Sequence, residues 1–558
     1  MAEKKALGKL LIDSGIITDE QLTMALDQQR ISKKRLGEVL VDLNIVTERQ
    51  ILEVLEYQLK IPFFDLNKFE IDEECPLLIN EAMARRHQIL PVNRENNELI
   101  VAMTDPLNLQ ALDDVRIFTG MSVKPIMATQ QDVLSSIDRF YSREDAEKAV
   151  EDFKKEIDFA QISESDNEAL SDVSNAPVVR LVNSVIQHAI RSRASDIHIE
   201  PFDKHLRIRF RVDGELLEIM KSAKAAHAAI VTRIKIMGKM DIAEKRVPQD
   251  GRVEMSLDGK DVDLRISILP TVYGEKIVIR LLGRSDLVMS KEQLGFSESN
   301  IVLFDGIIKS TNGIILVTGP TGSGKTTTLY AVLRELNKVN KNIITVEDPV
   351  EYRLEGINQV QVNTKAGLTF ANGLRSILRQ DPDIIMIGEI RDGETAQIAV
   401  RAAITGHLVL STMHTNDSAS TVSRLVDMGV EPYLVSSSVV GVTAQRLLRR
   451  ICPECKISYQ SDRAEMDVLR LREPITLYKG AGCSNCNHTG YRGRIAIHEI
   501  MQVTSQIRDL IDKRASIDHI RNVAVKQGST SLRENSVELV RKGVTTIDEL
   551  LKVTYSIE

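Results

Sequence analysis

The sequence contains no tryptophan, and aromatic residues make up only 4% of its 558 residues. Proteins that read nucleic acid or sugars by ring stacking need aromatic surfaces, so this composition argues against both classes. No apolar run approaches the roughly 18 residues that a membrane-spanning helix requires. The N-terminus reaches Asp13 before a signal-peptide core can form, so we expect a cytoplasmic protein.

Cysteine is also scarce. Five cysteines in a chain of this length are too few for a secreted disulfide scaffold. The length corresponds to about three to four domains, because single hydrophobic cores stop growing well below this size. With 43% apolar residues, each domain can bury a core of its own.

The excess of negative charge is small and local. The net charge is −7, and residues 143–172 hold eleven acidic and four basic residues, which leaves 68 of each in the rest of the chain. A balanced remainder argues against a dedicated DNA-binding protein. We expect residues 142–175 to form a solvated, partly helical linker; a solvated surface helix within one domain is the alternative.

Residues 1–60 contain an internal repeat at an offset of 29. Each unit has the pattern of a short helix, a turn and a second helix that begins at a threonine cap. A glutamine recurs in both units; it either hydrogen-bonds a ligand or partner, or is a satisfied polar core residue. Nine of the 23 aligned positions are identical: Leu7/Leu36, Gly8/Gly37, Leu11/Leu40, Asp13/Asp42, Ile16/Ile45, Thr18/Thr47, Gln21/Gln50, Leu26/Leu55 and Gln29/Gln58.

Two α/β domains are expected next along the chain. Residues 61–141 alternate short strands with helical stretches and show no catalytic constellation. Residues 176–288 begin with a helix, and one of the strands that follow alternates apolar residues with Arg207, Arg209 and Arg211. These arginines share a face, which is either solvated or suited to a polyanion or a neighbouring subunit's phosphate.

The strongest motif is a glycine-rich phosphate loop, G-x-x-x-x-G-K-T, between an apolar strand and a helix. Glycines let backbone N–H groups curl around phosphates, and the helix N-terminus adds its dipole. Lys325 can reach the β- and γ-phosphates, and the hydroxyl of Thr326 can bind Mg²⁺. The nucleotide-binding residues predicted here are Gly319, Pro320, Thr321, Gly322, Ser323, Gly324, Lys325, Thr326 and Thr327.

Acidic residues follow two of the predicted strands. Glu347 and Asp348 end one strand, and Glu389 follows the apolar run 384–387. Open α/β sheets bind ligands at the carboxyl ends of their strands, where one acid can hold Mg²⁺ and another can activate water. His407 and His414 flank a further strand; a histidine without metal ligands nearby is more often structural, and sensing of the γ-phosphate by His414 is the alternative.

Four of the five cysteines form two C-x₂-C pairs, Cys452 with Cys455 and Cys483 with Cys486. Two such pairs predict a structural, tetrahedral Zn²⁺ site, and the 27 residues between them predict a small excursion of the chain. Two redox dithiols are the alternative. Cys75 is left over and is expected to be an ordinary apolar residue.

Together these motifs resemble the secretion ATPase superfamily, specifically the type II secretion and type IV pilus assembly ATPases. The resemblance covers essentially the whole chain and implies an α/β, multidomain protein. A P-loop (RecA-like) ATPase domain is expected at 289–558, with the zinc insertion at about 450–490 and a helical tail. A PAS-like α/β domain at 176–288 and the helical plus α/β N-terminal region would precede it. The segments that carry the resemblance are RASDIHIEP, RVPQDGR, GPTGSGKTTTLY, ITVEDPVEY, RSILRQDPDIIMIGEIRD, GHLVLSTMHTNDS and GYRGRIAIHEI.

The resemblance also implies roles for individual residues. Glu347 would polarise the attacking water, Glu389 would help to hold Mg²⁺ with Thr326, and His414 would belong to the histidine box of the family. Arg252 and Arg265 are the best matches to arginines that reach a nucleotide in trans, with Arg211 a weaker one.

The assembly implied is a homohexamer that hydrolyses ATP to power a type IV pilus or a type II secretion pseudopilus. It would act on an inner-membrane platform protein and associate with that membrane through an anchoring protein. A retraction ATPase is an alternative, although those usually lack the long N-terminal region and the cysteine pairs. A DNA-uptake or conjugation ATPase and a non-enzymatic, nucleotide-gated scaffold are the others; no nucleic acid is expected as a partner.

The N-terminal repeat resembles the domain that binds cyclic di-GMP in some of these ATPases, where each unit begins Arg-Leu-Gly and ends near a glutamine. The second unit fits this pattern, whereas the first has Ala6 in place of the arginine. A docking module for a membrane partner is the alternative. The candidate contacts to cyclic di-GMP are Leu7, Gly8, Gln29, Arg35, Leu36, Gly37 and Gln58.

Overall fold

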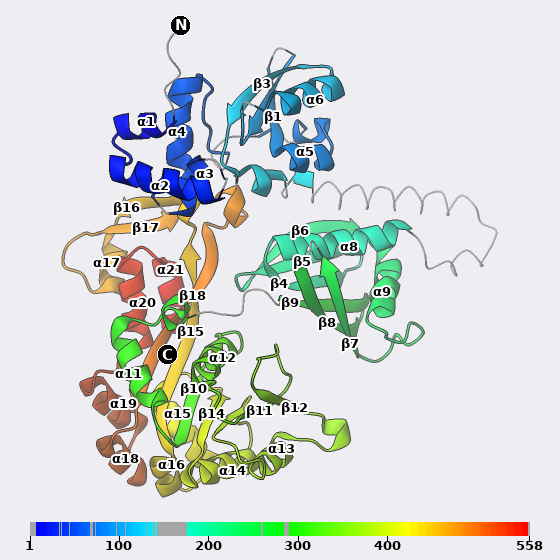
Figure 1. Ribbon diagram of the computed structural model, residues 1–558. Coiled ribbons are helices and arrows are strands. Elements are labelled where there is room, and N and C mark those ends of the chain that lie inside the picture. The colour runs from blue at the N-terminus through cyan, green and yellow to red at the C-terminus, as the bar shows by residue number, and fades with distance from the viewer. Residues whose placement is uncertain are drawn as a thin grey trace.

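The computed structural model describes residues 7–555 except for 33, 35, 44, 67–70, 73, 96, 107, 131, 138–139, 142–175, 258–259 and 284–289. The acidic linker predicted at 142–175 therefore lies outside the described residues. Figure 1 shows a helical and a small α/β unit at the N-terminal end, an antiparallel sheet, and a larger α/β unit at the C-terminal end.

The N-terminal repeat forms four helices. The second helix of each unit begins as its sequence predicts, because the Gln21 and Gln50 backbone N–H groups each donate to a threonine hydroxyl at 3.3 Å, those of Thr18 and Thr47. Gly8 is buried, and a Cβ there would lie 2.7 Å from Leu22 Cδ1, so this glycine permits close helix packing. The helices are α1 (Leu7–Asp13), α2 (Asp19–Ser32), α3 (Leu36–Asp42) and α4 (Glu48–Leu59).

A three-stranded sheet of order β1-β2-β3 follows. Strands β1 and β2 are antiparallel, whereas β3 runs parallel to β2 because α6 crosses over between them. Cys75 is 2% exposed and lies in the core of this unit, as expected. The elements are η1 (Pro76–Leu78), α5 (Glu81–His87), β1 (Ile89–Glu95), β2 (Glu98–Met103), α6 (Leu109–Thr119) and β3 (Ser122–Met127).

The next unit is a six-stranded antiparallel sheet of order β6-β5-β4-β9-β8-β7, with α8 and α9 packed on its apolar face. On its other face, the arginines of β5 pair within the chain: Arg207 and Arg209 both contact Glu200. Burial opposes the ionisation of Glu200, but hydrogen bonds from Arg209 and Lys276 outweigh it and lower the pKa of Glu200 to about 2. The elements are α8 (Ala176–Arg191), β4 (Ala194–Pro201), β5 (His205–Val212), β6 (Glu215–Ala223), α9 (Ala226–Met237), β7 (Gln249–Leu257), β8 (Lys260–Thr271) and β9 (Gly274–Gly283).

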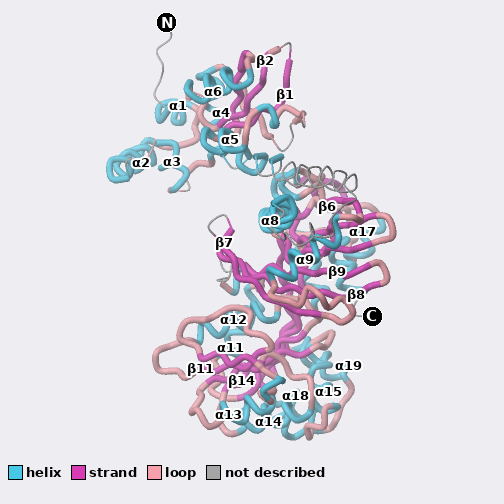
Figure 2. The backbone as a smooth tube through the Cα atoms, turned by 90° about the vertical axis from the view of Figure 1, so that its right-hand side faces the viewer, coloured by secondary structure: helices cyan, strands magenta, loops and turns pink. Residues whose placement is uncertain are grey.

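The C-terminal unit is built on a seven-stranded sheet of order β12-β11-β13-β14-β10-β15-β18, parallel except for β18. Helices cover both faces: α11 and α12 pack on one, and α13 and α14 on the other (Figure 2). Helices α15 and α16 pack on the same side as α13 and α14. The elements up to α16 are α10 (Lys291–Leu294), α11 (Glu298–Ile308), β10 (Gly313–Thr318), α12 (Lys325–Leu336), β11 (Ile343–Glu347), β12 (Asn358–Gln361), η2 (Thr364–Ala366), α13 (Phe370–Ile377), β13 (Ile384–Ile387), α14 (Gly393–Ile404), β14 (Leu408–Met413), α15 (Ser418–Asp427) and α16 (Pro432–Ser438).

The cysteine pairs and the helical tail complete this unit. The excursion predicted between the cysteine pairs is a two-stranded hairpin, β16 and β17, with α17 between its strands. Within the part of the chain that the structure describes, no helix is both long and apolar enough to cross a membrane. The remaining elements are β15 (Val439–Ile451), η3 (Pro453–Cys455), β16 (Lys456–Gln460), α17 (Arg463–Leu469), β17 (Thr476–Gly480), η4 (Ser484–Cys486), β18 (Tyr491–Gln502), α18 (Ser505–Asp512), α19 (Ile517–Lys526), α20 (Leu532–Arg541) and α21 (Ile547–Tyr555).

Candidate functional site: a phosphate loop and two acidic strand ends

The predicted phosphate loop connects β10, which is buried along its whole length, to the first residue of α12. Gly322 and Gly324 have φ angles of 79° and 86°, a backbone region that favours glycine, and this geometry turns the chain into the helix. The Lys325 ammonium lies inside the loop and donates to the carbonyl oxygens of Gly319 at 2.8 Å and Pro320 at 3.0 Å. These are the interactions that phosphate oxygens would replace.

Burial of the Lys325 side chain lowers its pKa to about 8; the nearby Glu389 opposes this shift, and Arg446 adds to it. A desolvated ammonium beside the N-terminus of a helix is suited to bind the phosphates of a nucleotide. The structure therefore places Lys325 where the motif predicts.

The two predicted acids lie at one edge of the sheet. Strands β11 and β13 are adjacent and parallel, so Glu347 at the end of β11 and Glu389 just after β13 follow the same edge as the phosphate loop after β10. Glu347 is 2% exposed, whereas the Glu389 side chain is 14% exposed. The carboxylate oxygens of these two acids and the hydroxyl of Thr326 are hard oxygen ligands, the kind that Mg²⁺ prefers.

His414 joins this edge, and His407 does not. His414 follows β14, and its Nε2 lies 3.2 Å from Glu389 Oε2, while Arg391 contacts the other carboxylate oxygen at 2.7 Å. His407 precedes β14, at the opposite end of the strand, and its Nδ1 lies 2.8 Å from the Ala402 carbonyl oxygen. Of the two histidines, His414 is the one near the candidate site, as the sequence suggests.

The structure adds residues that the motifs do not indicate. Gln445 of β15 is buried; its Oε1 accepts from the Thr328 hydroxyl at 2.8 Å, and its Nε2 donates to the Ser323 carbonyl at 2.8 Å. The next residue, Arg446, is 6% exposed and donates to the Asn416 carbonyl oxygen at 3.0 Å. Gln445 therefore holds the phosphate loop from the neighbouring strand, whereas Arg446 holds the segment that follows β14. The sequence signal for both residues is the unusual polarity of a buried strand.

A second group of new residues surrounds Glu347. The hydroxyl of Thr345 donates to its Oε1 at 2.6 Å and the Gln359 amide donates to the same oxygen at 3.1 Å. The Tyr330 hydroxyl donates to its Oε2. All three donors are uncharged.

The arginines predicted to act in trans lie on the preceding domain. Arg252 forms a two-pronged ion pair with Asp263, at 2.9 and 2.8 Å, while its side chain remains 53% exposed. Arg265 reaches the C-terminal unit of its own chain, where it contacts Glu351 at 3.1 Å and the Val350 carbonyl at 3.2 Å. Arg211 donates to the Gly214 carbonyl at 2.7 Å.

The same two units also meet at the turn after β5. Asp213 accepts the backbone N–H of Gly493 at 2.8 Å, and Glu215 pairs with Lys552 of α21 at 2.7 Å. The antiparallel-sheet unit therefore contacts the C-terminal unit both through β8 and through the turn between β5 and β6.

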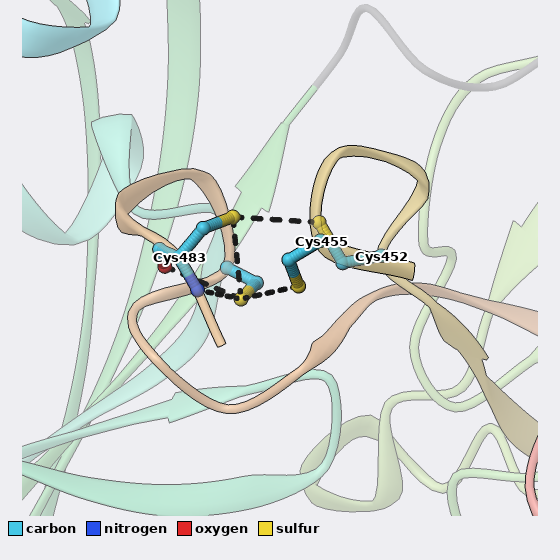
Figure 3. A group of neighbouring side chains, drawn as sticks. Cys452, Cys455 and Cys483 are labelled. Atoms are coloured by element: carbon cyan, nitrogen blue, oxygen red, sulfur yellow. Dashed lines mark hydrogen bonds between the residues drawn. The ribbon is translucent and has the colours of Figure 1, made fainter. Parts of the chain in front are cut away.

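The four predicted cysteine ligands form one buried group, with all Sγ atoms within 4.8 Å of one another (Figure 3). Three pairs of Sγ atoms lie 3.7 to 3.9 Å apart, and the cysteines are free. A tetrahedron with Zn–S bonds of about 2.3 Å has S···S edges of about 3.8 Å, so the group fits tetrahedral Zn²⁺. Backbone N–H groups of Gly482, Cys483 and Gly490 donate to Sγ atoms at 3.2 to 3.3 Å, which favours thiolates.

The described candidate contacts for cyclic di-GMP lie in the helical unit. Leu7 and Leu36 pack against its core, and Gly8 and Gly37 face the side chains of Leu22 and Ile51. The Gln29 amide donates to the Lys34 carbonyl at 3.1 Å. Arg35 and the side chain of Gln58 lie outside the part that the structure describes.

Comparison with known proteins agrees with this geometry. Residues 171–552 match the family described as type II/IV secretion system protein, and residues 59–147 match the MshEN domain. The second match begins at residue 59 and so leaves out most of the helical repeat. The chain is 43% identical over 556 residues to the type IV pilus assembly ATPase PilB of Myxococcus xanthus (strain DK1622), covering 98% of each chain. It is 47% identical over 483 residues to the type II secretion system protein E of Pectobacterium carotovorum subsp. carotovorum, covering 85% of this chain and 96% of the relative.

A solved structure shares the fold. The X-ray structure of the Yersinia pseudotuberculosis ATPase DotB aligns with a TM-score of 0.51 at 20% identity, covering 68% of this chain and 93% of that one. The matching family implies ATP and Mg²⁺ as cofactors, and the cysteine group could hold structural zinc. The chain is an ATP-hydrolysing enzyme that belongs to the type II/IV secretion system protein family.

Proposed function

We propose that this chain binds MgATP at the loop Gly319–Thr327 and hydrolyses it with Glu347 as the residue that activates water. The observation that carries this proposal is the position of Glu347 and Glu389 on adjacent parallel strands, at the sheet edge that also holds the phosphate loop. Phosphoryl transfer needs positioning and charge stabilisation more than covalent chemistry, and this edge supplies both.

The other groups have distinct roles in this proposal. Thr326 and Glu389 hold Mg²⁺, directly or through water, and Lys325 binds the β- and γ-phosphates. His414 contacts Glu389 and senses the γ-phosphate from there. Mg²⁺, when bound, neutralises the charge that develops on the phosphates.

ATP turnover by the full-length chain tests the assignment. Lys325→Ala and Glu347→Gln should each lower Mg²⁺-dependent hydrolysis at least 100-fold, roughly the cost of losing a catalytic group. Glu355→Gln is the matched control, because Glu355 is an exposed carboxylate in the loop that follows Glu347. An unchanged rate in either of the first two variants would refute the mechanism.

We also propose that the chain works as a homohexamer in which Arg252 reaches a nucleotide on a neighbouring subunit. Arg265, predicted for the same role, contacts Glu351 of its own chain instead. The Arg252 guanidinium supports this, since Asp263 and Glu254 orient it while its side chain remains 53% exposed. Mixing Lys325→Ala chains with Arg252→Ala chains should restore hydrolysis at mixed interfaces, where one chain supplies an intact loop and its neighbour an intact arginine. Failure of every mixture to exceed the separate variants would contradict the arrangement.

The work that we propose for the motor is assembly of a type IV pilus or of a type II secretion pseudopilus at the inner membrane. The high identity to both kinds of ATPase along most of the chain supports this. The chain would act from the cytoplasmic side, through a membrane platform protein and an anchoring protein. Deleting the gene and scoring surface pili and secreted proteins would distinguish the two cargoes.

A second proposal is that the N-terminal repeat binds cyclic di-GMP, supported by the repeated Leu-Gly and glutamine positions of its two units. Titration of the full-length chain should give a dissociation constant below about 100 μM, equivalent to about −5.5 kcal/mol. Gln29→Ala should weaken binding, whereas Gln28→Ala, one position along the same helix and exposed, should not. Absence of binding would leave the docking role for this repeat.

A further inference from the structure

The catalytic carboxylate of the proposed function sits in an unusual environment. Glu347 is 2% exposed, and each of its oxygens receives a hydrogen bond: Oε1 from Thr345 and Gln359, and Oε2 from Tyr330. Among the described residues, no cation forms an ion pair with this carboxylate. Its orientation therefore depends on hydrogen bonds from neutral donors, which are more directional than the attraction of a point charge.

Tyr330 is the donor that links Glu347 to the nucleotide-binding loop. It is 2% exposed on α12, the helix that begins at Lys325, and it lies five residues, or about 7.5 Å of helix rise, beyond that lysine. A rigid helix thus carries the phosphate-binding groups at its first turn and a hydroxyl against Glu347 further along.

The hydroxyl itself is held in place. Its oxygen accepts the backbone N–H of Glu351 at 3.4 Å, and the ring packs edge-on against Tyr352 with centroids 4.4 Å apart. Burial and the adjacent Glu347 carboxylate raise the pKa of Tyr330 far above its usual value, so the hydroxyl keeps its proton at neutral pH. It therefore acts as a donor to Glu347 and does not compete with it as a base.

We propose that Tyr330 is a positioning residue for ATP hydrolysis: its hydroxyl fixes the Glu347 carboxylate relative to the phosphate loop. This inference rests on the proposed role of Glu347 as the group that activates water. Loss of the hydroxyl would remove the donor to Oε2 and leave the carboxylate held through Oε1 by Thr345 and Gln359, which permits it to shift. A misplacement of about 1 Å costs up to roughly a hundredfold in rate when reacting groups must be aligned.

The test compares two tyrosines that touch. Tyr330→Phe removes the hydroxyl that contacts Glu347, whereas Tyr352→Phe removes a buried hydroxyl that has no hydrogen-bond partner within the described residues. In the full-length chain, Tyr330→Phe should lower kcat for MgATP hydrolysis by about 10- to 100-fold with KM unchanged. Tyr352→Phe should stay within about twofold of the parent on both constants, since it changes no contact of Glu347.

A double substitution separates positioning from a general packing role. If Tyr330 acts through Glu347, adding Tyr330→Phe to Glu347→Gln should leave the residual rate unchanged, because the two losses are not additive for residues that act as a unit. Thr345→Val is an isosteric change that removes another donor to the same carboxylate. It tests the positioning of Glu347 independently if Tyr330→Phe folds poorly, and it too should lower kcat with KM unchanged.

Four results would overturn the inference. A parent-like kcat in a folded Tyr330→Phe chain, or in Thr345→Val where Tyr330→Phe fails to fold, would show that the donors do not position Glu347. A further drop in the double variant, or a rise in KM equal to the fall in kcat, would show that Tyr330 supports the fold or binding alone. Parent-like activity in Glu347→Gln would instead refute the proposed function, and the inference with it.

Discussion

Replacement of one cysteine ligand gives a sharp test of the metal site. Cys486 lies in the buried four-cysteine group, where its Sγ is 3.7 Å from that of Cys483 and 3.9 Å from that of Cys455. Backbone N–H groups of Cys483 and Gly490 also donate to this sulfur. Cys486→Ser keeps the size of the side chain but removes the thiolate from the tetrahedron.

The expected magnitude follows from the number of ligands. Structural Zn²⁺ in small sites contributes about 10–16 kcal/mol, or about 2.5–4 kcal/mol for each of four ligands. One missing thiolate should therefore weaken zinc binding by roughly 10²- to 10³-fold. The β16–β17 hairpin should remain attached after metal loss, since Leu469 and Leu477 pack against Val540 and Leu550 of the tail. The cysteine loops themselves should open.

The assay is the zinc content of the purified chain during competition with a graded chelator, followed by limited proteolysis. The parent should hold one Zn²⁺ per chain, and Cys486→Ser should lose it at a lower chelator concentration and be cleaved between 481 and 489. Cys75→Ser is the matched control, because this cysteine is buried in the separate N-terminal core. Equal zinc retention in Cys486→Ser and the parent, or a parent without zinc, would refute the reasoning.

Two further predictions concern stability. His498 is 1% exposed, stacked on Phe296 with ring centroids 3.6 Å apart, and burial lowers its pKa to about 3 from 6.5. Because the pKa of His498 is lower in the folded chain, the unfolded chain takes up the proton first as the pH falls. The free energy of unfolding is therefore at its full value well above pH 6.5 and falls by about 2 kcal/mol between pH 7 and pH 5. His498→Phe should reduce the shift in the urea midpoint between these two pH values, whereas His519→Gln, at an exposed position, should not; an undiminished shift in His498→Phe would count against this account. In the second, Gly306→Ala in α11 should stabilise the ATPase unit by about 0.5–1 kcal/mol, since a Cβ there meets open space. Gly441→Ala should destabilise it by about 1–3 kcal/mol, because the new Cβ would lie 2.5 Å from Ile307 Cδ1. Thermal unfolding checks both variants, and a change in stability of the same sign in both would contradict this packing.

Local chemistry in the sequence determined much of this protein. The glycines and Lys325 of the phosphate loop, and the apolar run that forms β13, appear in the structure where their patterns predict them. The cysteine spacing predicted a four-ligand group and a small excursion between its halves, and both are present. These features depend on neighbours within a few residues, such as helix caps, turn geometry and strand burial, which a linear pattern encodes directly.

Only the tertiary structure decided which polar groups meet. The arginines of β5 face Glu200 and Asp196 because β4 lies beside β5 in the antiparallel sheet. Gln359 reaches Glu347 because β12 pairs with β11, and Tyr330 reaches it because α12 packs its apolar face on the same sheet. Such contacts join residues that are distant in sequence, and they are set by strand order and by which face of each element is buried. No local periodicity specifies either of these, so the partners of the predicted catalytic acid emerge only in the folded chain.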